Sequence, residues 1–356
     1  MSPGIVPPYL LARIAAAQEE NWARAAEAAQ RTLTAPRDYR PVRSRLRLSI
    51  EQPGTLVAEA TPAPDREISD AKNRQVLPGT RVRGEDDPAT GDAAVDESYD
   101  GLGATFDFWW DAYARDSIDG SGSSLPATVH YGRDYDNAFW NGERMVFGDG
   151  DGEVFRGFTG SLSVIAHELA HGVIEDEGGL LYRDQSGALN ESIADVFGAL
   201  AEQHHAGQTA DEATWLIGEG IFTDAVQGRA LRSLAAPGTA YDDDVLGKDP
   251  QPAHMRDYVE TRDDNGGVHI NSGIPNHAFY LAAQALGGHA WARAGLIWYR
   301  TLTAGTLPST ADFTVFARAT LTAAAAEYGE ESEEVDAVRA AWTSVGVIPD
   351  DHDAQP

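Results

Sequence analysis

His167 and His171 stand four positions apart in the run VIAHELAH, which spans residues 164–171. On a helix this spacing places both rings on one face, where they can reach a single metal ion. Glu168 follows the first histidine and would point toward the open side of that metal. A zinc ion with three protein ligands keeps a position for water, acidifies that water and polarises a carbonyl, while a nearby carboxylate takes the proton. The run therefore indicates metal-assisted hydrolysis, with a pair of surface histidines on a helix as the alternative.

A second acidic motif begins beyond the histidines, in the run ALNESIAD over residues 188–195. Glu191 and Asp195 share a helical face at their spacing. We predict that Glu191 supplies the third zinc ligand, and that Asp195 accepts the second N–H of a ligating histidine and so fixes its tautomer. Asn190 joins Asp195 in the predicted set of residues that surround the ligands. The apolar neighbours of Asp195 argue against a merely solvated acidic face.

The composition excludes several classes of protein. The 356 residues include 27 basic and 56 acidic side chains, a net charge of −29 that repels nucleic acid and anionic membranes. The absence of cysteine excludes a cysteine nucleophile, a zinc ribbon and a disulfide scaffold. The sequence contains no apolar run long enough to predict a transmembrane helix. We therefore expect neither a nucleic-acid partner nor a membrane partner.

The elements that must position these residues change character along the chain. A helix is expected over 9–33, a linker followed by strands and loops over 52–104, and β-hairpins over 127–147. Beyond these, helices are expected at 161–175, 187–205, 274–285, 290–303, 311–327 and 334–345. This order predicts an α+β fold in which a cleft between the β-rich half and the helical half holds the site.

The first 50 residues differ in charge from the rest. They hold eight arginines against four acidic residues, a net charge of +4, which leaves −33 for the remainder of the chain. Opposite charges of this kind favour association of the two parts. A basic tail without any partner is the alternative.

Together these motifs resemble those of the thermolysin-like zinc metalloproteases, whose signature is His-Glu-x-x-His with a glutamate on a following helix. The resemblance covers residues 65–347 in order. It includes NAFWNG at 137–142, GDGDG at 148–152, GLLY at 179–182, LRS at 231–233 and DNGGVHINSG at 264–273. It implies a two-lobed fold, with a β-rich N-terminal lobe, a helical C-terminal lobe and the zinc helix between them.

The resemblance assigns a role in catalysis to several of the matching residues. Glu168 would act first as general base and then as proton donor to the leaving amine. His269 and Tyr182 would stabilise the negative charge that develops on the carbonyl oxygen. Asp264, five residues before His269, would raise the pKa of that histidine through its adjacent negative charge.

Other matches concern the substrate. Asn137, Ala138, Trp140 and Arg232 would hold the peptide backbone, and Arg232 could bind either a substrate carbonyl or Glu191. A set of apolar side chains would line the pocket for the residue after the scissile bond, which implies cleavage before bulky apolar residues. These side chains are Phe155, Phe158, Val164, Ile217 and Leu231. Ordinary core packing is the alternative for all of them.

The calcium ligands of the family are only partly retained. Secreted relatives build a two-ion calcium site from clustered acids, of which Glu202 and Glu219 remain here. Ser163, Thr214 and Leu216 replace others. Ca²⁺ prefers roughly six to eight oxygen ligands. We therefore expect that the two-ion site is lost and that at most a weak site for one Ca²⁺ remains.

The run IVPPYLL at 5–11, followed by a helix, resembles the compact propeptide of the protealysin-like branch of this family. The resemblance implies a propeptide over 1–55, a β-rich catalytic lobe over 56–185 that includes the zinc helix, a helical lobe over 186–347 and a tail over 348–356. The propeptide would cover the active site until its autocatalytic removal by a cut within 37–47 or 49–60. A small protein inhibitor is a further partner that the branch implies. Because no signal peptide is recognisable, we expect the protein to be made in the cytoplasm and any export to use a non-classical route.

The sequence thus predicts a zinc-dependent neutral endopeptidase, made as a self-processing zymogen, that cleaves peptide or protein substrates before bulky hydrophobic residues. Two alternatives stay open at this point. One is a latent zinc protein that acts by binding a partner, and the other is a protease restricted to one dedicated partner. Retention of Glu168, Tyr182 and His269 favours an active enzyme.

Overall fold

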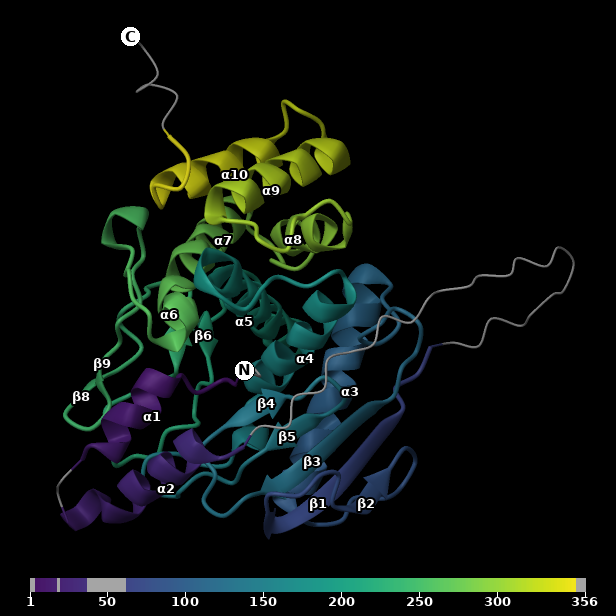
Figure 1. The fold of residues 1–356 in the computed structure, drawn as a ribbon. Helices are drawn as coiled ribbons and strands as arrows, with labels where there is room; N and C mark the ends of the chain where they lie inside the picture. Colours follow the sequence, from purple (N-terminus) through teal and green to yellow (C-terminus); the bar gives the residue numbers. More distant parts are fainter. Residues whose placement is uncertain (1–3, 18–19, 37–61, 350–356) are drawn as a thin grey trace, which may run out of the picture.

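The computed structural model describes residues 4–17, 20–36 and 62–349, which form two lobes with two N-terminal helices packed across them (Figure 1). The β-rich lobe contains a five-stranded sheet in the order β2-β1-β3-β5-β4. β1 is antiparallel to β2 and parallel to β3, β3 is parallel to β5, and β4 forms the edge as the antiparallel partner of β5. The strands are β1 (Arg66–Arg74), β2 (Thr80–Gly84), β3 (Leu125–Tyr131), β4 (Ala138–Trp140) and β5 (Met145–Phe147).

Three long helices connect the two lobes: α3 (Ala93–Tyr113), α4 (Leu162–Asp176) and α5 (Asp184–Ala206). α3 packs on β1, β3 and α4, whereas α4 packs on α5 and on β4. Every residue of α4 from Ser163 to Ile174 is buried. A helix that is enclosed on all sides lies in the interior of a protein, so α4 carries its few polar side chains into a region shielded from water.

The helical lobe continues beyond two small antiparallel hairpins that follow α5. These pair β6 (Leu216–Ile217) with β7 (Arg232–Ser233), and β8 (Asp242–Asp243) with β9 (Gly247–Lys248). The remaining helices are α6 (Asp264–Asn271), α7 (Gly273–Leu286), α8 (Ala294–Thr303), α9 (Phe313–Tyr328) and α10 (Glu333–Ser344), with 3₁₀ turns η1 (Glu20–Trp22), η2 (Phe158–Gly160) and η3 (Met255–Asp257). In their core, Trp298 of α8 stacks on Trp342 of α10 with ring centroids 6.0 Å apart.

The N-terminal part forms α1 (Pro8–Ala15) and α2 (Ala23–Thr34), which pack against each other. In Figure 1 these purple helices lie alongside the β8–β9 hairpin and the sheet, and the stretch before α1 runs inward toward α4 and β4. Arg24 and Arg31 both contact Asp134 through N–O distances of 2.9 and 3.1 Å. Two arginines of the N-terminal part therefore contact the acidic body, whereas the five arginines of 37–47 lie outside the described residues.

Three expectations about secondary structure are wrong in part. The helix predicted over 9–33 is divided into α1 and α2. Each of the two helices buries its own apolar face, and the chain must fold back between them for both faces to be buried. The stretch read as linker, strands and loops over 52–104 contains the first half of α3; its part up to residue 61 lies outside the described residues. The region 127–147 holds only one hairpin, β4–β5, since β3 pairs in parallel with both its neighbours.

The predicted fold class is confirmed: a sheet-containing N-terminal lobe and a helical C-terminal lobe, with α4 between them (Figure 1). Among the helices of residues 4–17, 20–36 and 62–349, none combines the length and the apolarity that a membrane crossing requires.

His130 joins two segments of the β-rich lobe that lie far apart in sequence. Its Nδ1 lies 2.9 Å from Asp149 Oδ1, in the loop after β5, and its Nε2 lies 3.2 Å from Asp92 Oδ2, at the N-cap of α3. The hydrogen bond with Asp149 is the main reason that the pKa of His130 rises to about 9.

We expect His130→Asn to destabilise the protein by roughly 1 kcal/mol at pH 6, a modest value because the ring is partly exposed and solvent screens the pair. In the unfolded chain the pKa is about 6.5, so the protonated ring contributes its full stabilisation below that pH and loses it as pH rises through about 9. Urea unfolding at pH 6 and pH 10 measures this. An equal difference between the two proteins at both pH values would contradict the account.

Candidate active site

The three predicted metal ligands converge at the contact between α4 and α5. Nε2 of His167 lies 3.1 Å from Nε2 of His171, and these atoms lie 3.5 and 3.6 Å from the carboxylate oxygens of Glu191. All three side chains are buried. Gly198 allows the approach of the helices, because a Cβ there would lie 2.7 Å from the Ser163 carbonyl oxygen of α4. Within the described parts of the chain, this is the one group of three or more such residues placed to hold a metal ion.

Ionisation of these side chains suits a cation. Burial lowers the pKa of His171 to about 4, so its ring is neutral and keeps a lone pair for a metal. Burial alone would raise the pKa of Glu191, but its electrostatic interactions with the surrounding histidines, that with His269 first, lower the pKa overall. Two imidazoles and one carboxylate match the donor set that zinc takes in hydrolases. The site is therefore a buried His-His-Glu metal site consistent with zinc.

A second layer of polar residues orients the ligands. Nδ1 of His167 lies 2.8 Å from Asp195 Oδ1, and Nδ1 of His171 lies 2.7 Å from Asn190 Oδ1. These contacts leave the Nε2 atoms directed at Glu191. Asp195 also accepts two hydrogen bonds of 2.8 Å from the Arg232 guanidinium and one of 2.8 Å from Asn276 Nδ2. Burial would raise the pKa of Asp195, but Arg232 and His167 hold it well below its usual range.

One element of that layer differs from the sequence-based expectation. Arg232 is predicted to bind either a substrate carbonyl or Glu191. Its side-chain partner is Asp195 instead of Glu191, and it also donates to a peptide carbonyl, that of Ile5. Asn276 was not predicted at all. Its position between Ile274 and Phe279, on an otherwise apolar helix face, could have indicated such a role. A buried amide needs a hydrogen-bond partner.

Glu168 lies beside the metal ligands and next to the edge strand. Its side chain is fully buried, and its Oε2 accepts a hydrogen bond of 2.9 Å from the backbone N–H of Trp140 on β4. A carboxylate held in this way is fixed in orientation while it can still accept a proton.

His269, Tyr182 and Asp264 form a hydrogen-bonded group on the other side of Glu191. The Tyr182 hydroxyl donates to Glu191 and lies 3.2 Å from Nε2 of His269. Nδ1 of His269 lies 2.7 Å from Asp264 Oδ1, and its backbone N–H donates to the same carboxylate. Burial acts to lower the pKa of His269, but the charges of Asp264 and Glu191, together with the hydrogen bond to Asp264, raise the pKa overall.

The start of α6 makes this arrangement possible. Asp264, Asn265, Gly266 and Gly267 all have positive φ values, from 50° to 92°. Such angles are uncommon outside glycine. At Gly266 a Cβ would lie 2.3 Å from the Asp184 carboxylate, so the turn that brings Asp264 to His269 requires a glycine there.

The N-terminal stretch Gly4–Val6 lies in the cleft between these groups and β4. The Gly4 carbonyl oxygen lies 3.2 Å from Nε2 of His269. Ile5 donates its N–H to the Ala138 carbonyl oxygen at 3.1 Å and accepts a hydrogen bond from Arg232 at 3.0 Å. Val6 donates to the Asn137 side-chain oxygen at 3.0 Å and accepts from its nitrogen at 3.1 Å. Predicted substrate-binding residues thus hold a peptide of this same chain.

The apolar residues predicted to form a specificity pocket are all buried: Phe155, Phe158, Val164, Ile217 and Leu231. Ile5 is fully buried in the same apolar cluster. The Leu231 N–H donates to the Ile217 carbonyl oxygen, so the β6–β7 hairpin that carries Arg232 also carries this side of the cluster.

Glu202 and Glu219, the remaining calcium candidates, line one small cavity of about 130 Å³. Burial raises the pKa of Glu202, and the charge of Glu219 raises it further, although a hydrogen bond from Ser163 opposes the shift. A pair of carboxylates is far from the oxygen shell that Ca²⁺ prefers.

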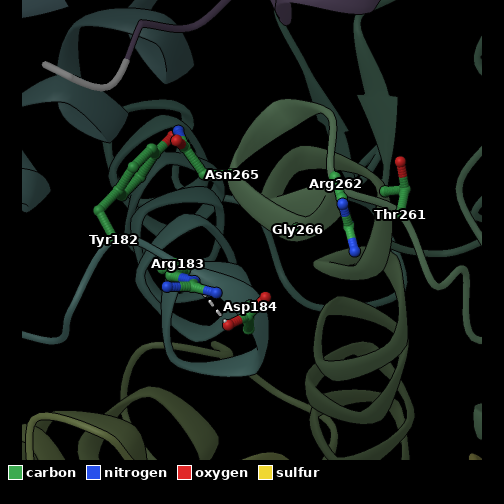
Figure 2. Close-up of a pocket in the computed structure, with 7 residues that line it drawn as sticks. All are labelled: Tyr182, Arg183, Asp184, Thr261, Arg262, Asn265 and Gly266. Atoms are coloured by element: carbon green, nitrogen blue, oxygen red, sulfur yellow. Dashed lines mark ion pairs between the residues drawn. The ribbon is translucent and has the colours of Figure 1, made fainter.

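A larger cavity of about 580 Å³ is lined by Tyr182 and by residues near the start of α6 (Figure 2). Figure 2 shows Tyr182 and Asn265 converging at one end of it, with the ion pair Arg183–Asp184 below and Arg262 and Thr261 across from them. No local sequence pattern predicts this cavity, because its lining comes from two segments that are distant in the chain.

Comparison with known families identifies this arrangement. Residues 54–175 match the catalytic domain of thermolysin metallopeptidases, and residues 178–347 match their α-helical domain. The chain belongs to the thermolysin metallopeptidase family. It is a thermolysin-family metalloendopeptidase, as the resemblance in its sequence predicted, and the ligands of the family's metal are those that meet between α4 and α5.

Individual thermolysin-family relatives match most of the chain. An extracellular metalloprotease of Pectobacterium carotovorum subsp. carotovorum is 51% identical over 96% of this chain and 96% of its own. The protease PrtS of a Photorhabdus strain is 52% identical over 79% of this chain and 76% of its own. The solved structure of the precursor of protealysin, a metalloproteinase from Serratia proteamaculans, is 50% identical, with a TM-score of 0.88 over 98% of this chain and 100% of that one.

Metal removal tests the thermolysin-family site. Zinc added back to protein from which the metal has been removed should raise the free energy of unfolding by about 4 kcal/mol when free zinc is 1,000 times the Kd for zinc. The reason is that zinc binds the folded state and not the unfolded state. His171→Ala should lose most of this gain, whereas His205→Ala, an exposed control on α5, should keep it. Ca²⁺ should give no comparable gain. Urea unfolding measures all four cases, and an undiminished zinc effect in His171→Ala would place the metal elsewhere.

Proposed function

We propose that this protein is a zinc-dependent neutral endopeptidase, made as a self-processing zymogen, that cleaves before bulky hydrophobic residues. The observation that carries the proposal is the seating of Gly4–Val6. This peptide is held through its backbone by Asn137, Ala138 and Arg232, and its Gly4 carbonyl faces His269 beside the metal ligands. Backbone recognition of this kind accepts any extended peptide of the right polarity.

The chain's own residues account for the steps of hydrolysis. Zinc bound by the His-His-Glu ligands supplies Lewis acidity to a water and a carbonyl. Glu168 takes the proton of that water and then gives it to the leaving amine. His269 and Tyr182 donate hydrogen bonds to the oxygen on which negative charge develops. Asp264 holds the His269 ring in place and favours its protonated form.

Other residues position these groups. Asp195 and Asn190 fix the tautomers of the ligating histidines. Trp140 contributes its backbone N–H, which orients Glu168, and Arg232 aligns the peptide carbonyl that follows the scissile bond.

The specificity follows from the apolar cluster around Ile5. Burial of an isoleucine or valine side chain contributes about 1.5–3 kcal/mol. Substrates with a bulky apolar residue after the scissile bond would gain this energy against Phe155, Phe158, Val164, Ile217 and Leu231. A charged residue there would be buried without a partner.

The zymogen proposal rests on the same contacts. We assign residues 1–55 to a propeptide, 56–185 and 186–347 to the catalytic lobes and 348–356 to a tail. The propeptide cut expected within 37–47 or 49–60 lies outside the described residues. The protealysin precursor offers a structural precedent for a chain that retains such a segment.

Several other expectations remain proposals. The relatives named as extracellular support action outside the cell. We also propose a small protein inhibitor as a partner and, at Glu202 and Glu219, a weak site for a single Ca²⁺. Membership of a family of metalloendopeptidases leaves the non-proteolytic alternative without support, whereas restriction to one dedicated protein substrate stays open.

Substitution of the base tests the mechanism. In protein freed of its N-terminal part by trypsin, we expect Glu168→Gln to lower the rate of peptide hydrolysis by about 10²–10⁴-fold, the usual contribution of general base catalysis. Glu175→Gln, a matched change near the end of the same helix, should leave the rate within about twofold. Zinc content measured beside the rates must be equal in all samples. Full activity in Glu168→Gln would rule out its role as base.

Charge reversal tests how the propeptide is held. Arg24→Glu combined with Arg31→Glu removes both contacts with Asp134. We expect peptide hydrolysis by the full chain to appear roughly two- to fivefold sooner, because exposed ion pairs contribute little and burial of Ile5 and Val6 dominates. Arg318→Glu, an exposed arginine on α9, is the control. If the time at which peptide hydrolysis appears is the same in the double variant and the wild type, at low and at high salt, these ion pairs do not hold the propeptide.

A further inference from the structure

The direction of the N-terminal peptide determines which of its bonds faces the metal site. The Gly4 carbonyl oxygen is the one placed at His269 Nε2, 3.2 Å away, and that nitrogen lies 3.5 Å from Glu191. The next backbone group, the Ile5 N–H, donates to Ala138 at 3.1 Å. The peptide bond at the reacting position is therefore Gly4–Ile5.

The proposed base lies on the same side as the nitrogen of that bond. β4 carries both Ala138, which holds the Ile5 N–H, and Trp140, which holds Glu168 Oε2 at 2.9 Å. One short strand thus fixes the leaving nitrogen and the proton carrier relative to each other. Such fixed proximity is what makes an intramolecular reaction fast.

We infer that the enzyme hydrolyses its own Gly4–Ile5 bond within the same molecule, and that the trimmed propeptide stays in the cleft. The inference rests on the proposed function. Water adds its oxygen to the Gly4 carbonyl carbon, the C–N bond to Ile5 breaks, and Glu168 carries a proton from the water to the Ile5 nitrogen. The products are a Gly4 carboxylate and a chain that begins with the amine of Ile5.

The contacts on the two sides of the bond explain why trimming does not release the propeptide. Beyond the cut, Ile5 and Val6 remain buried and keep their bonds to Arg232 and Asn137. They also stay covalently joined to α1, whose apolar face is buried through Leu10, Leu11 and Ile14. On the other side of the bond, Gly4 contacts Nε2 of His269, and the neighbour of that nitrogen, Tyr182, lines the cavity shown in Figure 2.

This cut also names a substrate class for the site: peptides with a small residue before the bond and a β-branched apolar residue after it. Gly4 and Ile5 supply these features in the chain itself. The trimmed propeptide acts as a bound product, so the first cleavage leaves the enzyme inhibited, and activation needs the separate loss of the helices α1 and α2.

The test follows the N-terminus of full-length protein that is purified in chelator and then given zinc. We expect intact mass and N-terminal sequencing to show a chain beginning at Ile5 that still carries α1 and α2. Its formation should be first order, with a rate constant unchanged over a tenfold range of protein concentration. Glu168→Gln with equal zinc should keep Gly4. Hydrolysis of an added peptide should stay at least tenfold below that of trypsin-treated protein.

A second readout does not depend on zinc. In chelated wild type and in Glu168→Gln, the Ile5 and Val6 amides should exchange with deuterium at least tenfold more slowly than those of a free peptide of the same sequence. Unprotected amides, or cleavage whose rate constant rises with protein concentration, would overturn the inference. If Gly4 is retained while the trypsin-treated protein hydrolyses peptide, the inference fails and the proposed function stands. If neither reaction occurs, the proposed function fails as well.

Discussion

The structure depends on one buried carboxylate, that of Asp195. It lies 2.8 Å from His167 Nδ1 and accepts hydrogen bonds from Nε and Nη2 of Arg232. A buried charge is costly unless it is paired and hydrogen-bonded, and here three side chains, with Asn276 as the third, satisfy it. The same group therefore fixes a metal ligand and the arginine that binds a peptide carbonyl. Metal binding and peptide binding therefore both depend on the carboxylate of Asp195.

Because the arginine that binds a peptide carbonyl is fixed beside the metal ligands, the short stretch Gly4–Val6 can lie directly at the metal site. Gly4–Val6 contacts Asn137, Ala138 and Arg232, the residues proposed to hold a substrate backbone, and Ile5 is buried in the main hydrophobic core. Opposite charges at Arg24, Arg31 and Asp134 only add to that docking, because exposed pairs are screened by solvent. In the proposed zymogen, inhibition and catalysis use one set of interactions, and the covalent link to α1 and α2 keeps the peptide of Gly4–Val6 at the site.

The sequence predicted the site better than its surroundings. The spacings of His167, His171, Glu191 and Asp195 lie within helices, where periodicity alone fixes which side chains share a face. α3 was missed because Gly101 and Gly103 resemble loop residues, although a Cβ at Gly101 would lie 2.3 Å from Ile165 and glycine there permits close packing. The parallel pairing of β3, the cavity beside Tyr182 and the support from Asn276 depend on contacts between distant segments, which no local pattern encodes.

The most direct measurement of the central claim is the zinc affinity and the peptide KM of Asp195→Asn, each determined after circular dichroism has shown a native fold. Because one carboxylate supports both functions, zinc affinity should fall by about 10–100-fold, and the peptide KM at saturating zinc should rise with it as Arg232 loses its partner. Zinc affinity equal to that of the wild type, or a KM that does not change, would contradict the account.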